Sequence, residues 1–271
     1  METKLNVKLL SHTMNPELVI ASAGKLCYSP CAIDELIAKQ DEESIEKFVK
    51  RLVSMGHESP LEHAVFNFAI EGVSRSLTHQ LVRHRIASYS QQSQRYVNLE
   101  NSFKYVVPKN IGENQYIKHI FEKAMNSAFE YYVLIARELL EDKMYRFLVV
   151  DKKEYSEDAD IKFLEQVMKK EYKKEYNAFL KQAIEDARAV LPNACETKII
   201  CTMNLRTLIN FCHHRCCRRA QDEINELAWA MKAEVEKVSP LLGQCLGATC
   251  QFGKCPEGAM SCGEPFERLR G

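Results

Sequence analysis

The sequence predicts a single α/β domain, closer to the α+β kind, in which a small, mostly antiparallel sheet is flanked by long helices. Apolar residues recur at helical spacing over most of the chain, and only a few short segments alternate as strands do. These strand segments do not alternate regularly with helices, as they would in a parallel βαβ fold. The 271 residues, 46% of them hydrophobic, suffice for a core of that size.

The first third of the chain contains the clearest strand. Residues 64–72 (AVFNFAIEG) alternate, with Ala64, Phe66, Phe68 and Ile70 on one side, as in a strand with one buried face. Around it the spacing predicts a strand at 5–10 (LNVKLL) and helices at 15–23, 33–40, 43–55 and 75–83.

The remaining chain is mainly helical. The spacing predicts helices at 114–141, 161–190 and 205–238, and a strand at 195–203 (CETKIICTM). The charged segment 151–160 is predicted to be a solvated loop within an insertion around residues 142–176. The domain is predicted to occupy residues 1–240, and a cysteine-rich tail, residues 241–271, follows it.

Composition argues against several classes of protein. The 37 basic residues balance the 37 acidic ones, and the basic excess of a nucleic-acid or membrane-surface protein is absent. Charged residues interrupt the N-terminal segment, so neither a signal peptide nor a membrane span is predicted, and a cytoplasmic location is expected. Eleven cysteines, an odd number, fit reduced thiols better than a disulfide scaffold.

The segment RHRIASYSQQSQRY, residues 83–96, concentrates donors that bind phosphate. Arg83 and Arg85 are predicted to end a helix, and the serines that follow, with Arg95 beyond them, are predicted to lie in a loop. Arginine forks and serine hydroxyls together satisfy the oxygens of a phosphate. The alternative is a solvated basic loop, but no acidic residue within the segment neutralises the arginines. An anionic ligand is therefore preferred.

A second basic segment lies in the predicted helix 205–238. Its apolar stripe comprises Leu205, Leu208, Ile209, Cys212, Cys216, Ala220, Ile224, Leu227 and Met231. Arg215 and Arg219 each follow a stripe residue by seven positions, which places them on the core side of a continuous helix. A charge there needs a partner, either a carboxylate such as Glu223 or a bound anion, and spacing favours neither.

Two clusters resemble metal sites only superficially. His57 and His63 are six residues apart with Pro60 between them, which does not match the zinc-binding pattern H-E-x-x-H, and Ser59 with Glu62 fits a capping box. In the tail, the gaps do not match common zinc knuckles, so reduced thiols are preferred to a metal site or cluster. The tail cysteines are Cys245, Cys250, Cys255 and Cys262, which Cys195, Cys212, Cys216 and Cys217 could join in space.

Residues 83–95 resemble the signature of the flavin-dependent thymidylate synthases, R-H-R-x-x-S-x-x-x-x-S-x-R. Every fixed position is matched, by Arg83, His84, Arg85, Ser88, Ser93 and Arg95. The flanking segments GHESPLEH, ARAVLP and NLRTLINF resemble further family motifs in the same order. The resemblance covers residues 56–230 and leaves out the segment between the two long helices and the tail.

The resemblance implies a homotetrameric enzyme that uses FAD and NADPH and converts dUMP to dTMP, with methylenetetrahydrofolate as the carbon donor. Its active sites would lie at subunit interfaces, and Arg188 would reach a neighbour's nucleotide. The dUMP site would comprise Gln80, Gln91, Ser93, Gln94, Arg95, Arg188 and Arg215. The FAD site would comprise His57, Ser59, Arg83, His84, Arg85, Asn204, Arg206, Asn210 and Arg219.

In this reading Arg215 is the catalytic residue. Its guanidinium would stabilise negative charge that develops on the pyrimidine, and reduced flavin would supply the hydride. The chain departs from the family pattern in three places. Gln91 stands where some members carry an acid, and Arg219 stands where a histidine is common. Residues 27–30 (CYSP) lie where other members place a serine near the flavin, and no flavin contact is assigned there. The departure at Arg219 puts its flavin contact in question.

Three other functions remain open at this point. A non-catalytic nucleic-acid module could use the tail cysteines and the HHRCCRR patch, and would bind zinc and show salt-dependent affinity. A zinc hydrolase centred on His57 and His63 would lose its activity to chelators. The third is a homologue that binds the ligands without turnover, and the retained signature arginines count against it.

Overall fold

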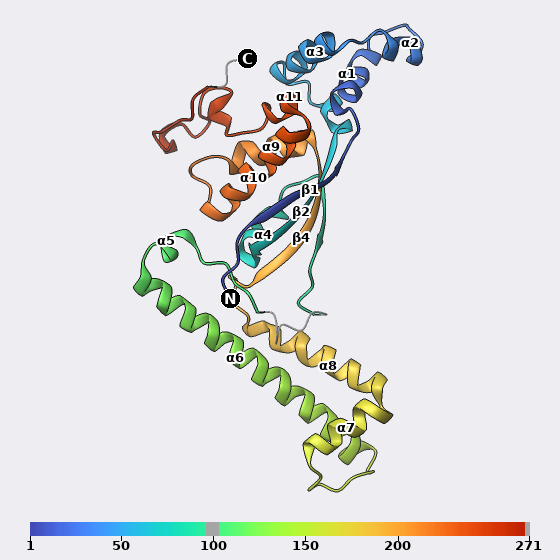
Figure 1. Ribbon diagram of the computed structural model, residues 1–271, viewed down its shortest axis with the longest axis vertical. Helices are drawn as coiled ribbons and strands as arrows, with labels where there is room; N and C mark the ends of the chain where they lie inside the picture. Colours follow the sequence, from blue (N-terminus) through green and yellow to red (C-terminus); the bar gives the residue numbers. More distant parts are fainter. Residues whose placement is uncertain (96–102, 269–271) are drawn as a thin grey trace. The chain divides into compact units, whose positions relative to one another are not determined.

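The computed structural model describes residues 1–95 and 103–268, and this part of the chain forms two units (Figure 1). The sheet unit consists of Lys4–Gln91 and Thr197–Gly271, and the helical unit of Met1–Thr3 and Gln92–Glu196. In these described ranges no helix is long and apolar enough to cross a membrane.

The sheet unit is built on four strands in the order β1-β2-β4-β3. β1 pairs antiparallel with β2, and β3 pairs antiparallel with β4. Their bounds are Asn6–His12 for β1, Val65–Ser74 for β2, Ala87–Gln91 for β3 and Glu196–Asn204 for β4. The predicted small antiparallel sheet is thereby confirmed, and with it the α+β class.

Side chains that alternate along β2 place one face of the sheet in the core. Ala64, Phe66, Phe68 and Ile70 are buried as predicted, whereas Asn67 between them is half-buried. Helices α4, α9 and α10 (Arg75–Leu81, Leu205–Arg215 and Asp222–Val238) add their apolar stripes to the same core. The apolar stripe predicted from residue 205 to residue 231 is buried or half-buried throughout, and so forms core.

The other helices of this unit lie before the second strand and in the tail. Side-chain caps begin two of them: Asp41 accepts from Ser44 N at 2.7 Å at the start of α3, and the Ser239 hydroxyl accepts from Leu242 N at 3.2 Å in α11. The bounds are Pro16–Leu26 for α1, Ile33–Ala38 for α2, Glu42–Ser54 for α3, Ser59–His63 for η1, Pro240–Gly243 for α11, Thr249–Gln251 for η4 and Gly258–Met260 for η5.

The helical unit is dominated by α6 (Gln115–Tyr145), a helix of 31 residues that packs along α8 (Figure 1). Asn114 caps its first turn by accepting hydrogen bonds from Tyr116 N and Ile117 N. The remaining bounds are Lys109–Gly112 for α5, Arg146–Asp151 for the π-helical η2, Ile161–Glu171 for α7, Lys173–Ala187 for α8 and Arg188–Val190 for η3.

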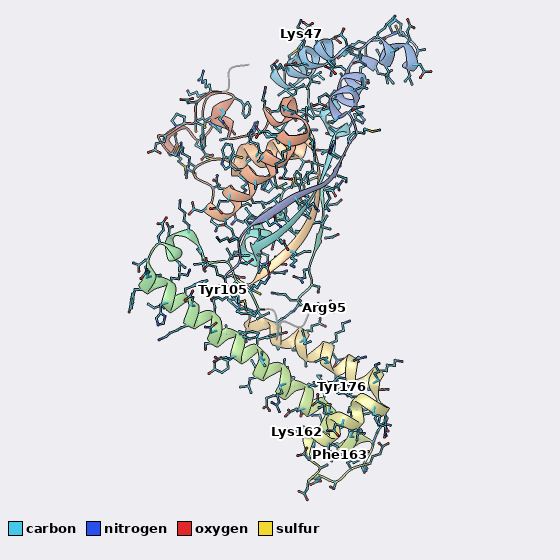
Figure 2. All side chains as sticks on the ribbon, viewed as in Figure 1. Lys47, Arg95, Tyr105, Lys162, Phe163 and Tyr176 are labelled. Carbon is cyan, nitrogen blue, oxygen red and sulfur yellow. The ribbon has the colours of Figure 1, made fainter. Side chains whose placement is uncertain are left out.

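The single helix predicted at 161–190 is wrong, because Tyr172 divides it into α7 and α8. Its backbone leaves the helical region at φ −124° and ψ 44°, and its hydroxyl donates to Glu154 Oε2 at 2.8 Å. Nearby, the Tyr176 hydroxyl on α8 donates to Glu165 Oε1 on α7 at 3.0 Å (Figure 2). No proline or glycine marks this break, so only contacts between the helices decide it.

The continuous helix predicted at 205–238 is also wrong. α9 ends at Arg215 and α10 begins at Asp222. The Asn225 amide donates to the carbonyl oxygens of Arg215 and Cys217, at 2.7 and 3.1 Å, and so satisfies carbonyls that a helix end leaves exposed. A side chain from the second helix thus stabilises the end of the first.

The loop predicted after Arg85 contains a strand instead. Residues Ala87–Gln91 form β3, which pairs with β4 from Ala87 opposite Met203 to Gln91 opposite Ile199. Ser88 and Ser90 are exposed while Tyr89 between them is half-buried. Serines favour turns locally, but this alternation matches a strand and the partner strand supplies its hydrogen bonds. Tyr96, the end of the quoted segment, lies outside the described residues.

Candidate active site

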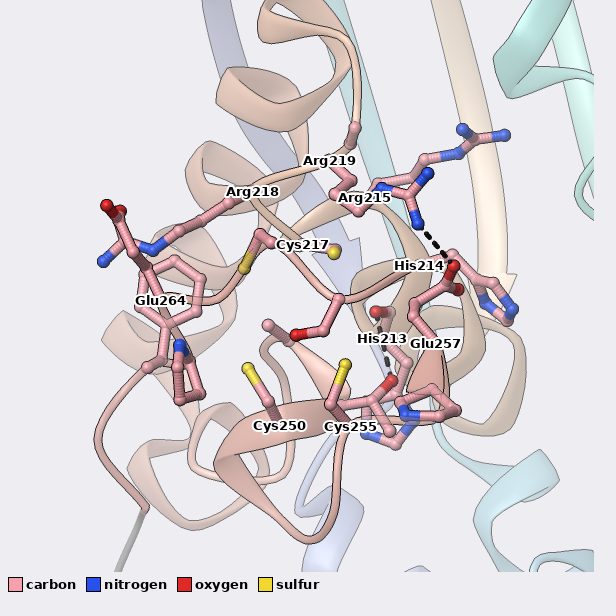
Figure 3. A pocket seen from close by; sticks show the side chains of 18 of the residues that line it. His213, His214, Arg215, Cys217, Arg218, Arg219, Cys250, Cys255, Glu257 and Glu264 are labelled. Carbon is pink, nitrogen blue, oxygen red and sulfur yellow. Dashed lines mark hydrogen bonds and ion pairs between the residues drawn. The ribbon is translucent and has the colours of Figure 1, made fainter. Parts of the chain in front are cut away.

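A cavity of about 540 Å³ lies in the sheet unit, where the end of α9 faces the tail (Figure 3). Its lining contains arginine and histidine side chains, which come from the signature, from α9 and from the turn that follows α9. It also contains cysteine thiols, which come from the same turn and from the tail. Four residues of the predicted sites line it: His84, Asn210, Arg215 and Arg219. The tail contributes Cys250, Cys255, Glu257, Cys262, Glu264 and Phe266, among others.

His84 is fixed in the turn between α4 and β3. Its carbonyl oxygen lies 2.8 Å from the Tyr89 hydroxyl, which also lies 2.9 Å from the Leu81 carbonyl oxygen. Its ring meets the ring of Phe211 edge-on, with 4.9 Å between centroids. The half-buried Tyr89 therefore ties the signature turn to the end of α4.

Arg215 meets this histidine from the end of α9. Its Nε donates to His84 Nε2 at 3.1 Å, and its Nη1 lies 3.5 Å from Gln80 Oε1. The side chain is half-buried, as predicted for a core-side arginine, but its partner is a neutral ring and not a carboxylate. Two segments 131 positions apart in the sequence are thereby joined at the cavity.

Electrostatics keep His84 unprotonated. Burial, followed by the positive charges of Arg215 and His214, lowers the pKa of His84 to about 4. Burial and the neighbouring Arg83 also lower the pKa of Arg215, but a guanidinium remains charged in proteins. At neutral pH the contact therefore joins a cation to a neutral acceptor.

Arg219 does not lie on the core side, which corrects the prediction made from helical spacing. It lies beyond the end of α9, is exposed, and donates to Glu257 Oε2 at 2.9 Å and to the Met260 carbonyl oxygen (Figure 3). Glu223, which spacing offered as its partner, instead accepts from the Ser74 amide and hydroxyl at 2.6 and 2.7 Å. The tail therefore supplies the carboxylate for Arg219.

The other residues predicted to bind flavin lie outside the cavity lining. Arg206 is exposed and paired with Glu58 at 2.8 Å and Glu62 at 2.6 Å, so Glu62 does not form the predicted capping box. Asn204 caps α9 by accepting from Thr207 N at 2.9 Å. The remaining four are all exposed: His57, Ser59, Arg83 and Arg85.

The residues predicted to bind dUMP are divided between the units. In the sheet unit, Gln80 donates to Gln221 Oε1 at 3.1 Å, and Gln91 donates to Thr78 Oγ1 at 2.9 Å. The helical unit contains Ser93, Gln94, Arg95 and Arg188. There Arg95 Nε lies 2.5 Å from Glu185 Oε1, and Arg95 N donates to Ser93 Oγ at 3.1 Å.

The cysteines are all free thiols, and several are buried core residues. Burial raises the pKa of the Cys201 thiol to about 12 and that of Cys245 to about 11, so both stay protonated. Of the side chains that the structure describes, no three from histidine, cysteine, aspartate and glutamate are placed to hold a metal ion.

Residues of the tail that line the cavity were missed as site residues. The sequence offered two signals, the tail cysteines and the HHRCCRR patch, but the tail lies outside the family motifs, so its residues were not assigned to the site. The turn at 216–221 brings them together, and Thr249 Oγ1 donates to the His213 carbonyl oxygen at 3.2 Å.

Together these features define an α+β protein with a basic cavity in its sheet unit, suited to an anionic ligand. Comparison with known proteins identifies the family. The family model described as "Thymidylate synthase complementing protein" matches residues 8–241. The chain therefore belongs to this family, as the resemblance of residues 83–95 predicted.

Three of its relatives carry the name flavin-dependent thymidylate synthase. The relative from Clostridium tetani is 51% identical over 263 residues, which cover 97% of this chain and 95% of the relative. The relative from Geobacter sulfurreducens is 41% identical over 267 residues, covering 98% and 97%. The relative from Pyrococcus furiosus is 37% identical over 263 residues, covering 93% and 90%.

A solved structure shares the fold. It is described as a UMP/dUMP methylase, PolB from Streptomyces cacaoi, bound with 5-Br dUMP. Its TM-score is 0.64 at 19% identity, and the match covers 90% of this chain and 94% of that one. At this identity the likeness concerns the fold alone.

Proposed function

We propose that the protein is a flavin-dependent thymidylate synthase that methylates dUMP reductively. The balanced reaction takes dUMP, methylenetetrahydrofolate, NADPH and a proton to dTMP, tetrahydrofolate and NADP⁺. Family membership and relatives named for this activity support the proposal. The observation that carries it is the contact of Arg215 with His84, which joins the family signature to the end of α9 at one cavity.

The exposed residues of the signature fit FAD. Arg83 and Arg85 offer guanidinium groups for its diphosphate, and in the described ranges neither has an ion-pair partner. Ile86 beside them is 84% exposed and offers an apolar face for a ring. Asn210 adds an amide at the cavity. When bound and reduced by NADPH, the flavin supplies the hydride.

Arg206 and Arg219 are less direct candidates for flavin binding than Arg83 and Arg85. Both are exposed and already paired with carboxylates of this chain, Arg206 with Glu58 and Glu62 and Arg219 with Glu257. Either would have to exchange that partner for flavin. Exposed ion pairs of this kind contribute only about 0–1 kcal/mol, so the exchange costs little.

Arg215 would act on the pyrimidine. Carbon 5 of dUMP must become electron-rich before it attacks a methylene carbon, and negative charge then develops on the ring oxygens. A half-buried guanidinium held beside them stabilises this charge more than water does. The new carbon–carbon bond would form between carbon 5 and the methylene carbon, and the proton would leave carbon 5. The bonds from the methylene carbon to the folate nitrogens would break, which releases tetrahydrofolate, and the added hydride would complete the methyl group.

The nucleotide phosphate would be bound by Ser93, Gln94 and Arg95, with Arg188 serving a neighbouring subunit. The proximity of the Arg95 amide to Ser93 Oγ, at 3.1 Å, supports a compact anion-binding turn. Gln80 and Gln91, with uncharged amides, would complete the nucleotide contacts without repelling the phosphate.

We further propose a homotetramer with active sites at its subunit interfaces. Apolar side chains on the sheet support it: Leu10 on β1 is 51% exposed and Ile200 on β4 is 45% exposed in the single chain. Native mass spectrometry should find four chains of 31.2 kDa, and a monomer at working concentration would contradict the proposal. The free thiols suit a reducing cytoplasm, and no nucleic-acid or membrane partner is proposed.

The function is tested by the visible spectrum of gently purified protein, before and after anaerobic NADPH and dUMP. A two-band flavin spectrum that bleaches on reduction is expected, and dTMP should form when methylenetetrahydrofolate is added. A broad featureless band would indicate an iron–sulfur cluster on the cysteines. A colourless protein that takes up no FAD, or flavin-loaded protein that makes no dTMP, would overturn the proposal.

A further inference from the structure

The contact between His84 and Arg215 assigns a role beyond flavin binding to the central histidine of the signature. An Nε–H group of arginine can donate to imidazole Nε2 only when that nitrogen is unprotonated. We propose that neutral His84 is a positioning residue, which holds Arg215 in the orientation that dUMP requires. This inference rests on the proposed function and deepens it.

His84 is built to hold a fixed position. Its backbone carbonyl oxygen lies 2.8 Å from the Tyr89 hydroxyl, and its ring stands edge-on against Phe211 at 4.9 Å. The first restraint comes from β3 and fixes the backbone of His84, and the second comes from α9 and orients its ring. Its Nε2 lone pair is thereby directed at Arg215.

Arg215 is restrained along its length. Asn225 donates to its carbonyl oxygen at 2.7 Å, His84 accepts from its Nε at 3.1 Å, and Gln80 Oε1 lies 3.5 Å from Nη1. No protein acceptor for Nη2 is found within residues 1–95 and 103–268. The planar guanidinium is therefore fixed through Nε and Nη1, while Nη2 remains available to a ligand at the cavity.

A neutral residue is required here because the surroundings are already positive. Arg215, Arg83 and His214 bring positive or ionisable groups to the site, while Phe211 and the Tyr89 hydroxyl bring none that is charged at neutral pH. A protonated histidine would lose its acceptor and repel the guanidinium. Histidine thus offers a rigid acceptor without the negative charge that would neutralise Arg215 and weaken its effect on the substrate.

Two substitutions of His84 distinguish the loss of its hydrogen-bond acceptor from the loss of its side-chain volume. His84→Gln keeps an acceptor near the place of Nε2, whereas His84→Leu keeps much of the volume without an acceptor. We expect His84→Leu to lower kcat for dTMP about 100-fold, the cost of a misplaced catalytic group. His84→Gln should recover most of that loss, and His79→Gln, on the exposed side of α4, should change nothing.

Measuring flavin content and NADPH-dependent flavin reduction shows whether a variant loses turnover because it binds or reduces flavin less well. Both should stay near wild type in His84→Leu if the histidine acts through Arg215. Equal turnover in His84→Leu and wild type, or a His84→Gln variant as impaired as His84→Leu, would overturn the inference. If His84→Leu does not fold, a double-mutant cycle on the dUMP dissociation constant with His84→Asn and Arg215→Lys decides. The shorter amide of asparagine does not reach Arg215, and lysine has no Nε–H group, so each change removes the contact. The two effects must then be non-additive, and strict additivity refutes the contact.

Nitrogen-15 NMR of histidine-labelled protein tests the contact without substrate or turnover. The signal lost in His84→Gln identifies His84, which should be neutral at pH 7 with its proton on Nδ1, and should not titrate between pH 5 and 8. A His84 that titrates near its ordinary pKa would overturn the inference even if the enzyme makes dTMP. Conversely, the expected NMR result with no dTMP formed would refute the proposed function and leave the hydrogen bond intact.

Discussion

Arg215 is the residue on which the proposed chemistry depends most. Truncating it to alanine removes the guanidinium that would stabilise charge on the pyrimidine, while most of the proposed flavin contacts remain. We expect Arg215→Ala to lower dTMP formation by about 10²- to 10³-fold or more, with flavin still bound and reducible by NADPH. Single-turnover assays with flavin content measured in parallel would show this.

A matched control for that variant is Arg51→Ala, which removes an exposed arginine on α3. It should keep wild-type turnover. Near-normal dTMP formation by Arg215→Ala would remove Arg215 from the mechanism.

Arg95 tests the phosphate site. Its guanidinium lies 2.5 Å from Glu185, so it is already oriented by a carboxylate in the same unit. Because hydrogen bonds to charged groups contribute about 1.5–3 kcal/mol, Arg95→Ala should raise the dUMP dissociation constant by about 10- to 100-fold. Titration calorimetry measures the change directly.

The folding control for Arg95 lies in the same unit. Arg137→Ala removes an ion pair of similar length, 2.7 Å to Glu141, from the surface of α6. Both variants should have nearly wild-type melting temperatures, and only Arg95→Ala should lose dUMP affinity. An unchanged dissociation constant would exclude Arg95 from the phosphate site.

At the scale of the elements, the tail makes contacts with α10 and with the turn after α9 that the sequence did not predict. Besides the pair of Glu257 with Arg219, Phe266 packs on Trp229 at 5.4 Å between ring centroids and beneath the Arg218 guanidinium at 4.3 Å. These contacts make the tail one wall of the cavity, although the family model ends at residue 241.

Glu257 is predicted to compete with flavin for Arg219. Glu257→Gln weakens the ion pair and releases the guanidinium, so flavin should bind more tightly, by up to about fivefold for a pair worth no more than 1 kcal/mol. Fluorescence titration of the apoprotein with FAD measures this. Glu264→Gln is the control, since Glu264 lies 4.0 Å from Arg218, which is not a predicted flavin residue. Equal affinities in both variants would mean that Arg219 does not contact flavin.

On the scale of the whole molecule, the pairing of β1 with β2 depends on one glycine. Gly72 has a φ of +72°, and a Cβ there would lie 1.8 Å from the Lys4 carbonyl oxygen. Gly72→Ala must therefore displace the backbone before β1, and should lower the free energy of unfolding by at least about 2 kcal/mol.

Urea unfolding of Gly72→Ala and Gly253→Ala provides the comparison. A Cβ at Gly253 would meet no atom within 4 Å, so that variant should unfold like wild type. Equal midpoints for the two variants would show that the sheet tolerates displacement at Gly72.

Local pattern was enough to predict most of the elements and the family. The buried alternation of Phe66, Phe68 and Ile70 and the apolar stripe from Leu205 to Met231 are properties of neighbouring residues, and the structure has both. The signature at residues 83–95 is likewise a pattern of neighbouring residues, so it was recognised without the fold.

Long-range contacts decided the rest. The end of α9 depends on Asn225, the break between α7 and α8 on packing around Tyr172, and β3 on its pairing with β4. None of these leaves a proline or glycine at the break, so propensity alone gives no sign of them.

The sequence by itself therefore determined the fold class, the core faces and the family of this protein. Tertiary structure alone decided that Arg215 meets His84 and that Arg219 meets Glu257. The physical reason is that the partners of a charged side chain are chosen by three-dimensional distance. In this chain those partners lie 131 and 38 residues away, beyond the reach of helical or strand periodicity.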